Sequence, residues 1–381
     1  MALGYGVVRR HTPPPMNTSL LNAAPLRVGL IGWGYASQVF HGPLITSTPG
    51  LQLVAVSSRQ PERVRADLGE TVAVHADPVS LIARTDLDVV VIPTPNDTHY
   101  PLALAALQAG HAVVVDKPFT LNADEARHLV AVARERGQLL SVFHNRRWDG
   151  DFLTAQALVT SGRLGRITHA QLHFDRFRPT VRERWREGSG PGAGIWFDLA
   201  PHLLDQAVQL FGWPVALQAD VLTQRTGGQS PDGFHARLRW ADGLRVDLHA
   251  SMLAALPGPR FALHGTLGSW VKHGLDAQED ALKAGQRPDP AGLEAWGADP
   301  QAGTLATVQP DAPDAPPQVQ PWPTQPGRYP AFYADLRDAL HGLAPNPVPA
   351  EEALGVQVLL DLGAQSARER GECSVAARLS M

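Results

Sequence analysis

Short apolar runs alternate with amphipathic stretches along the first 148 residues of the chain. Runs rich in aliphatic residues, as in strands buried on both faces, lie at 26–31, 51–57, 72–74, 87–92, 112–115 and 139–143. Stretches with helical periodicity separate them, at 39–46, 61–68, 100–109 and 122–136. Strands that alternate with helices form right-handed βαβ units. The pattern therefore predicts a doubly wound parallel sheet in an N-terminal α/β domain over residues 26–148.

The pattern changes near residue 150. Alternation of polar and apolar residues, typical of strands with one buried face, predicts longer strands at 167–177, 215–224, 234–240, 244–252 and 261–272. Helices are predicted at 151–161 and 196–211, and Ala241-Asp242-Gly243 has the composition of a hairpin turn. We therefore expect a second domain, of the α+β class with a mostly antiparallel sheet, over residues 149–381.

The remaining segments are less regular. Residues 275–328 are rich in Pro, Gly, Asp and Ala, a composition that predicts a long surface excursion. Two helices, at 330–342 and 351–370, close the chain and can pack back on the first domain. At the other end no apolar stretch follows Arg9-Arg10, so residues 1–25 are interpreted as a disordered leader rather than an export signal.

The composition excludes several classes of function. A net charge of -4 without a basic block leaves no electrostatic footprint for nucleic acid. The single cysteine, Cys373, excludes an intrachain disulfide and a cysteine-based metal site, and it suits a reducing compartment. No apolar run reaches the roughly 18 residues of a membrane span. These features predict a cytoplasmic protein that acts on a small molecule, without a nucleic-acid or membrane partner.

A glycine-containing turn, Gly32-Trp33-Gly34-Tyr35-Ala36-Ser37, follows the first predicted strand. The first glycine permits a tight turn, the second lets a pyrophosphate approach the backbone, and the small Ser37 replaces the third glycine of the usual pattern. The helix that follows would offer free amides to the phosphates. An ordinary glycine-rich turn is the alternative. The position between a strand and a helix favours binding of a dinucleotide, NADP or NAD.

The end of the second predicted strand bears on the choice between these cofactors. It reads Ser57-Ser58-Arg59, without the acid that usually binds the ribose hydroxyls of NAD. An arginine at this place suits the 2′-phosphate of NADP, so we expect NADP to be preferred. The alternative is that Arg59 is a solvated loop residue.

Four motifs together resemble the Gfo/Idh/MocA oxidoreductases: Thr94-Pro95-Asn96-Asp97-Thr98-His99, Asp116-Lys117-Pro118-Phe119, Asn145-Arg146-Arg147-Trp148-Asp149 and Asp198-x-x-x-His202. The resemblance covers residues 26–370 and is greatest to the NADP-dependent scyllo-inositol dehydrogenase group. It implies a large open sheet in the second domain, often used for oligomer contact. One residue departs from the family pattern, because Asp116 stands where Glu is usual.

The chemistry of alcohol oxidation supports the same candidate residues independently of the family resemblance. Oxidation of a secondary alcohol needs a base for the hydroxyl proton and a donor that polarises the oxygen. Lys117 follows a strand end, where ligands meet a doubly wound sheet, and it is one of only three lysines. Asp198 and His202 lie four residues apart, on one face of a helix, and His202 can serve as general base near neutrality. A surface lysine and a solvated i,i+4 pair are the alternatives.

The site is predicted to contain two groups of residues besides the catalytic Lys117, Asp198 and His202. The cofactor group is Gly32, Trp33, Gly34, Tyr35, Ala36, Ser37, Ser57, Ser58, Arg59, Thr94, Pro95, Asn96, His99, Asp116 and Lys117. The substrate group is Asn145, Arg146, Trp148, Asp149, Arg176, Asp198 and His202. Trp148 can equally belong to the core, and Arg176, with Arg178 on the same side of a strand, can face substrate or solvent. No metal site is expected.

These observations predict an NAD(P)-dependent dehydrogenase that interconverts a secondary alcohol and a ketone on a polyol, inositol or sugar. The family resemblance implies a homo-oligomer, a dimer or tetramer formed through the second sheet. Two alternatives stay open. One is an enzyme that uses the nicotinamide transiently, for elimination or glycoside cleavage, and the other is a non-catalytic sensor of NADPH or a sugar.

Overall fold

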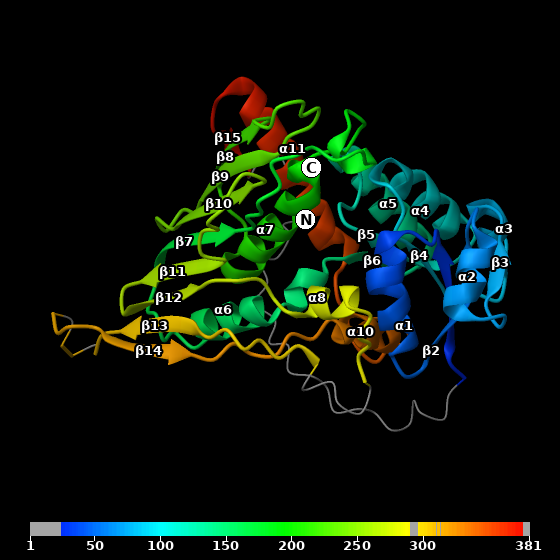
Figure 1. The fold of residues 1–381 in the computed structure, drawn as a ribbon, viewed down its shortest axis with the longest axis horizontal. Helices are drawn as coiled ribbons and strands as arrows, with labels where there is room; N and C mark the ends of the chain where they lie inside the picture. The colour runs from blue at the N-terminus through cyan, green and yellow to red at the C-terminus, as the bar shows by residue number, and fades with distance from the viewer. Residues whose placement is uncertain (1–23, 290–295, 310, 313, 376–381) are drawn as a thin grey trace.

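The computed structural model describes residues 24–289, 296–309, 311–312 and 314–375. Two sheets stand side by side, and α7 (Ile195–Phe211) and α11 (Ala350–Glu369) lie between them (Figure 1). Each sheet has its own hydrophobic core. The interpretation of residues 1–25 as a disordered leader falls almost entirely outside the described residues.

The first sheet has six parallel strands in the order β3-β2-β1-β4-β5-β6. The strands are β1 (Leu26–Ile31), β2 (Leu51–Ser57), β3 (Ala73–His75), β4 (Val89–Ile92), β5 (Ala112–Asp116) and β6 (Leu140–Phe143). Four of them, β1, β2, β4 and β5, carry long aliphatic runs that are almost wholly buried, as parallel strands covered on both faces require. The doubly wound arrangement is confirmed, and it places the carboxyl ends of β1, β4 and β5 side by side.

Helices connect these strands. They are α1 (Gly42–Thr46), α2 (Pro61–Leu68), α3 (Pro78–Ile82), α4 (His99–Gln108) and α5 (Ala123–Arg136). The helix predicted over 39–46 begins as the π-helical turn η2 (Ser37–His41) before it becomes α1. None of the helices in the described ranges combines the length and the apolar character that a bilayer crossing requires.

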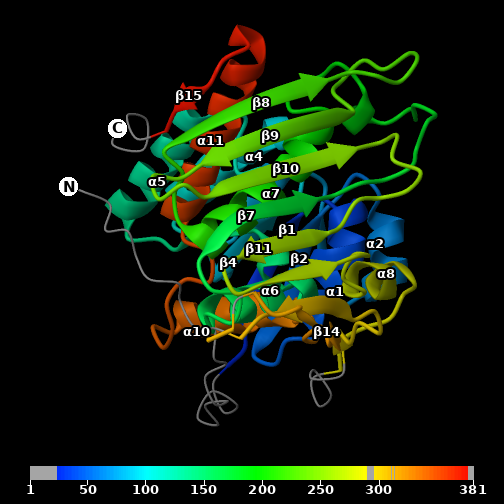
Figure 2. The same cartoon turned by 90° about the vertical axis from the view of Figure 1, so that its left-hand side faces the viewer.

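The second sheet has nine strands in the order β14-β13-β12-β11-β7-β10-β9-β8-β15. The strands are β7 (Ile167–His173), β8 (Ala216–Leu222), β9 (Gly233–Arg239), β10 (Arg245–Ser251), β11 (Phe261–Gly265), β12 (Gly268–Lys272), β13 (Gly303–Thr307), β14 (Gln318–Trp322) and β15 (Cys373–Ser374). All pairs are antiparallel except β7 with β10. The mostly antiparallel sheet is therefore confirmed, and Figure 2 shows one of its faces in front of the helices.

Two predictions for this part of the chain are wrong. The single strand predicted over 261–272 is the hairpin β11–β12, because Gly265 and Gly268 bound a two-residue turn and the strands pair with each other. A side chain on Gly268 would collide with the carbonyl of Ala306 on the next strand. Strand lengths are also shorter than predicted, as in β7, which ends at His173 although the chain continues beside β10.

The segment 275–328 is likewise not a simple surface excursion. It contains the short helix α8 (Gln278–Lys283) and the strands β13 and β14, which extend the second sheet. Asp276 and Gln278 are buried, where Asp276 accepts from the amide of Gly150 and Gln278 donates to the carbonyl of Trp148. Its Pro- and Gly-rich composition does not reveal these polar anchors.

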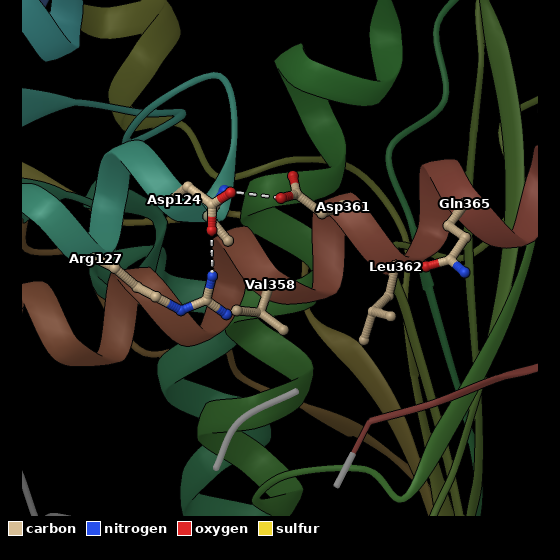
Figure 3. A pocket seen from close by; sticks show the side chains of 7 residues that line it. Asp124, Arg127, Val358, Asp361, Leu362 and Gln365 are labelled. Carbon is tan, nitrogen blue, oxygen red and sulfur yellow. Dashed lines mark hydrogen bonds and ion pairs between the residues drawn. The ribbon is translucent and has the colours of Figure 1, made fainter. Parts of the chain in front are cut away.

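Three further helices complete the core, namely α6 (Gly150–Thr160), α7 and α10 (Pro330–Leu340). The last helix, α11, joins the two cores, since Ala353 packs in the first and Leu359 in the second. Its Asp361 accepts a hydrogen bond of 2.7 Å from the amide of Ala123 at the start of α5. Figure 3 shows Asp361 facing this helix start, beside the Asp124–Arg127 ion pair. The chain thus returns to the first sheet.

Candidate active site

The turn after β1 has the geometry of a phosphate cradle. Gly32 has a φ of +89°, a conformation that side chains rarely adopt, and its carbonyl accepts from the Ser37 hydroxyl at 2.7 Å. A Cβ added at Gly34 would meet no described atom within 4 Å. Space is therefore left beside the backbone at the position where the second glycine of the motif admits a pyrophosphate.

The side chains of this turn point to different surroundings. Trp33 is 8% exposed and its indole donates to Asp67 of α2 at 2.7 Å, so its ring belongs to the packing of the domain. Tyr35 is 54% exposed and lies near α8, where burial and then the charge of Glu279 raise the pKa of its hydroxyl. The backbone of the turn, rather than the Trp33 ring, is thus available to a cofactor.

The loop after β2 is placed beside the turn, because the carbonyl of Ser57 accepts from the amide of Gly32 at 2.8 Å. Ser57 is buried, Ser58 accepts from the amide of Gln60, and Arg59 is exposed. Within the described part of the chain, Arg59 forms no ion pair with an acid. Its guanidinium is free to meet an anion next to the turn.

The loop after β4 is locked to the loop after β5 by His99. One ring nitrogen of this buried histidine lies 2.7 Å from the carbonyl of Pro118 and the other 2.9 Å from that of Thr94. Burial lowers the pKa of His99, while the charge of Asp116 and the contacts with both carbonyls act in the opposite direction. Beside it, Asn96 donates to the carbonyl of Gly192 at 2.9 Å and so connects the first domain to the loop before α7.

Asp116, which stands where the family has Glu, forms a hydrogen bond within its own loop. Its carboxylate accepts from the amide of Lys117 at 2.7 Å and lies 3.8 Å from the Nε2 of His41. Burial alone would raise the pKa of Asp116, but His41, followed by Lys117, outweighs it and lowers the pKa to about 2. The ionised carboxylate therefore supports the backbone that presents Lys117.

Lys117 and Asp198 meet across the two domains. The ammonium lies 2.9 Å from the Oδ1 of Asp198 and 2.9 Å from its backbone carbonyl at the start of α7. Arg176 and Arg186 each approach the same carboxylate to 3.8 Å. Burial raises the pKa of Asp198, yet Lys117, then Arg176 and Arg186, hold it well below its ordinary range. One carboxylate is thus surrounded by three cations.

His202 follows Asp198 by one helical turn on α7 and is 4% exposed. Among the described residues its Nδ1 has no hydrogen-bond partner. Burial, then the positive charges of Lys117 and Arg146, hold the pKa of His202 well below the ordinary value. The imidazole is therefore neutral and able to accept a proton.

Arg176 lies beside Asp198, whereas three other predicted substrate residues are buried. Arg146, Trp148 and Asp149 are 6%, 1% and 1% exposed. Arg146 pairs with Glu279 of α8, and Asp149 accepts from the hydroxyl of Tyr329 at 2.7 Å. Their polar groups belong to a buried network.

The neighbouring Asn145 is also buried, at 6% exposure. The network that contains Arg146 reaches α7, because Gln206 of α7 donates to the carbonyl of Arg146 at 2.9 Å. This group of residues therefore supports the position of α7.

Comparison with known proteins bears on this geometry. The model of an "oxidoreductase family, NAD-binding Rossmann fold" matches residues 26–144, and that of the "GFO/IDH/MocA C-terminal domain" matches residues 152–271. The chain is 52% identical to the uncharacterized oxidoreductase YdgJ of Escherichia coli, over 92% of this chain and 99% of that protein. The chain belongs to the Gfo/Idh/MocA family of oxidoreductases.

Two other similarities extend over nearly the whole chain. One is to the scyllo-inositol 2-dehydrogenase (NADP(+)) IolW of Bacillus subtilis, with 35% identity over 91% of this chain and 94% of that protein. The other is to the structure of a protein of Yersinia pestis described as an oxidoreductase, with 48% identity and a TM-score of 0.87, covering 93% of this chain and 98% of that one. The family resemblance predicted from the motifs is confirmed.

As a Gfo/Idh/MocA oxidoreductase with an NAD-binding Rossmann domain, the chain uses NAD(P). The described residues fit this cofactor. The open space at Gly34 and the free Arg59 lie at the carboxyl edge of the first sheet, and Lys117 lies at the same edge.

Sequence reasoning missed two residues near the site. His144 is 2% exposed and, among the described residues, has no hydrogen-bond partner for either ring nitrogen. It follows β6 directly, as Lys117 follows β5, so its position was a usable signal. Arg186, which approaches Asp198, lies in the short 3-10 helix η5 (Trp185–Glu187), a segment for which the sequence shows no periodic pattern.

Proposed function

We propose that this chain is an NADP-dependent dehydrogenase that interconverts a secondary alcohol and a ketone on a polyol, inositol or sugar. The observation that carries the proposal is the contact of Lys117 with Asp198 at 2.9 Å beside the buried, neutral His202. All three lie near the carboxyl edge of the cofactor-binding sheet. The 35% identity with a scyllo-inositol 2-dehydrogenase supports a polyhydroxylated substrate.

Each residue has a distinct part in this reaction. In the direction of oxidation, His202 accepts the proton of the substrate hydroxyl, and in reduction it returns that proton. Lys117 donates a hydrogen bond to the same oxygen and stabilises the charge that develops on it. Asp198 fixes the ammonium of Lys117 and can accept from a second substrate hydroxyl. When bound, the nicotinamide takes up or supplies the hydride.

The test is reduction of NADP by the purified protein with a panel of inositols, neutral sugars and sugar acids. We expect turnover with at least one of them, and a loss of kcat/KM of about 10²–10⁴-fold in His202→Ala, because general-base catalysis is removed. His128→Ala, at an exposed histidine bonded to Tyr100, is the matched control and should leave kcat/KM unchanged.

Three results would contradict the proposed reaction. Unchanged turnover in both His202→Ala and Lys117→Ala on an identified substrate would refute the assigned roles. Consumption of a sugar without net reduction of the cofactor would indicate transient oxidation, and cofactor binding without turnover of any substrate would indicate a sensor.

We also infer a dimer or tetramer formed through the open face of the second sheet. That face is free of described helices in Figure 2 and carries polar side chains at alternate positions of β7, β9 and β10. Light scattering should give a mass of two or four chains. A mass of one chain at micromolar concentration would contradict the inference.

A further inference from the structure

The open face of the second sheet carries a row of histidines. His173 of β7 lies opposite His249 of β10, and His249 lies opposite His235 of β9. Paired residues on neighbouring strands project to the same face. The residues before them, Leu172, Leu248 and Phe234, are buried against the helices on the other face. All three rings therefore stand on the open face.

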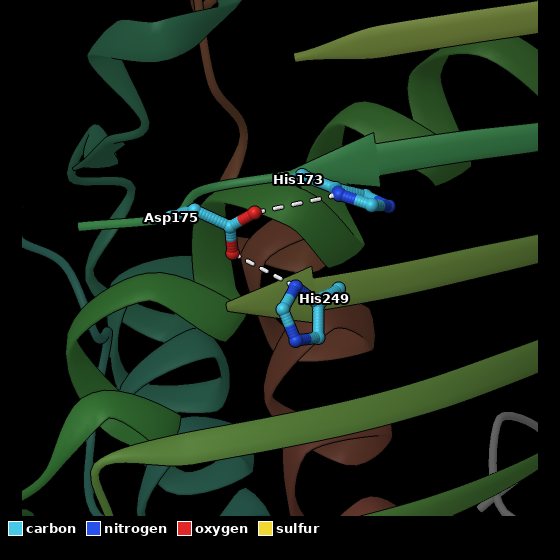
Figure 4. A group of neighbouring side chains, drawn as sticks. All are labelled: His173, Asp175 and His249. Carbon is cyan, nitrogen blue, oxygen red and sulfur yellow. Dashed lines mark ion pairs between the residues drawn. The ribbon is translucent and has the colours of Figure 1, made fainter. Parts of the chain in front are cut away.

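Asp175 completes a cluster with two of these rings. It lies two residues beyond His173, on the same side of the chain, and its side chain is 3% exposed. Its Oδ1 is 2.8 Å from the Nδ1 of His249 and its Oδ2 is 3.5 Å from the Nδ1 of His173 (Figure 4). The amide of Gly258 donates to Oδ2 at 3.0 Å, and a side chain on Gly258 would collide with His173.

The charge of this carboxylate lacks the usual partner. In the described ranges of the chain, no lysine or arginine pairs with Asp175. By contrast Asp247, on the same face, pairs with Arg237 at 2.8 Å. A buried carboxylate needs a cation, and here only imidazoles are at hand.

We propose that His173, Asp175 and His249 bind a divalent transition-metal ion, zinc foremost. Their ligand atoms all lie within 4.8 Å of one another. Two imidazole nitrogens and one carboxylate oxygen are a donor set that zinc prefers. The ring of His235 lies beside that of His249, with centres 4.2 Å apart, but it is not one of the three ligands.

This site is separate from the dehydrogenase site. The side chain of Arg176, next to Asp175, points to the other side of the strand, where it approaches Asp198. A metal held by His173 and His249 would clamp β7 to β10, the parallel pair of the sheet. The inference therefore does not depend on the proposed reaction.

The experiment is zinc binding by the full-length, tag-free protein, stripped with a chelator and dialysed against Zn²⁺ at neutral pH. We expect about one zinc per chain by elemental analysis. Calorimetric titration should show affinity weakened at least about tenfold in Asp175→Asn and in His249→Gln. His169→Gln is the matched control, since His169 is on the same face but bonded to Asp247, and it should bind like the wild type.

Two results would overturn the site. One is a wild type that retains no stoichiometric zinc. The other is equal binding by the wild type, both cluster variants and the control.

Should the cluster variants not fold, Co²⁺ added to the wild type gives an independent readout. A visible absorption band of bound Co²⁺ that Zn²⁺ abolishes supports the site, and its absence contradicts the site.

Discussion

A histidine acts as a general base only while its imidazole is neutral, and the surroundings of His202 keep it so. Burial comes first, and the charges of Lys117 and Arg146 add to it. Because the pKa in the folded protein is lowered, the neutral form persists as the pH falls below the ordinary value of about 6.5.

The lowered pKa of His202 should affect the pH dependence of the reaction. With an uncharged polyol as substrate, the acid limb of kcat/KM for oxidation should lie below about pH 6.5 and should be absent from the residual activity of His202→Ala. The measurement is a pH profile of NADP reduction. A limb centred above this pH in the wild type would show that the imidazole is not held neutral.

We propose that the choice between NADP and NAD depends on Arg59. Its exposed guanidinium, next to the phosphate turn, can bind the 2′-phosphate of NADP but has no such group to bind in NAD. Arg59→Ala should raise the KM for NADP by about tenfold or more, since about 1.4 kcal/mol corresponds to tenfold, and leave that for NAD nearly unchanged.

Arg65→Ala is the control for this variant, because Arg65 sits on the nearby α2 but pairs with Glu62 and Glu70. Equal losses for NADP and NAD in Arg59→Ala would contradict the assignment.

Residue-level prediction from the sequence could place side chains where a motif and a strand end coincide. Lys117 follows β5, and the spacing of Asp198 and His202 places them on one helix face. It left open whether Trp148 belongs to the core, and it did not reveal that Asp149 is buried, because its partner Tyr329 lies 180 residues later in the chain. Such contacts are set by packing and leave no local pattern.

At the scale of elements, the two glycines of the phosphate turn should differ in their effects on stability and on cofactor binding. Gly34→Ala should fold as the wild type does, because the added Cβ meets no described atom within 4 Å. The same methyl group would occupy the space of a pyrophosphate, so cofactor affinity should fall by about tenfold or more. Thermal unfolding and cofactor titration measure the two effects.

Gly32→Ala is the contrasting variant. Its φ of +89° makes a side chain strained, so it should lose roughly 1–2 kcal/mol of stability. Wild-type cofactor affinity in Gly34→Ala would disprove this reading of the turn.

The parallel strands of the first sheet were predicted almost to the residue, because strands buried on both faces form continuous aliphatic runs. The second sheet was less predictable. The turn inside 261–272 contains Leu267, which continues the apolar pattern, so the hairpin was read as one strand. In 275–328 the strands β13 and β14 pair with distant partners and carry few apolar residues.

At the scale of the whole molecule, α11 connects the two cores, so we expect them to unfold as one cooperative unit. It packs in both cores, and Asp361 bonds to the start of α5. We expect a single calorimetric unfolding transition. NADP at a hundred times its Kd should stabilise the entire molecule by about 2.7 kcal/mol. Two transitions, of which NADP shifts only one, would show that the cores unfold independently.

The central claim is net hydride transfer between a secondary alcohol carbon and the cofactor. Its most direct test uses a polyol substrate, found by the panel, that carries deuterium on the reacting carbon. After turnover with NADP, mass spectrometry should find deuterium in accumulated NADPH, together with the ketone product. Turnover of the labelled substrate without accumulation of deuterated NADPH would contradict the account.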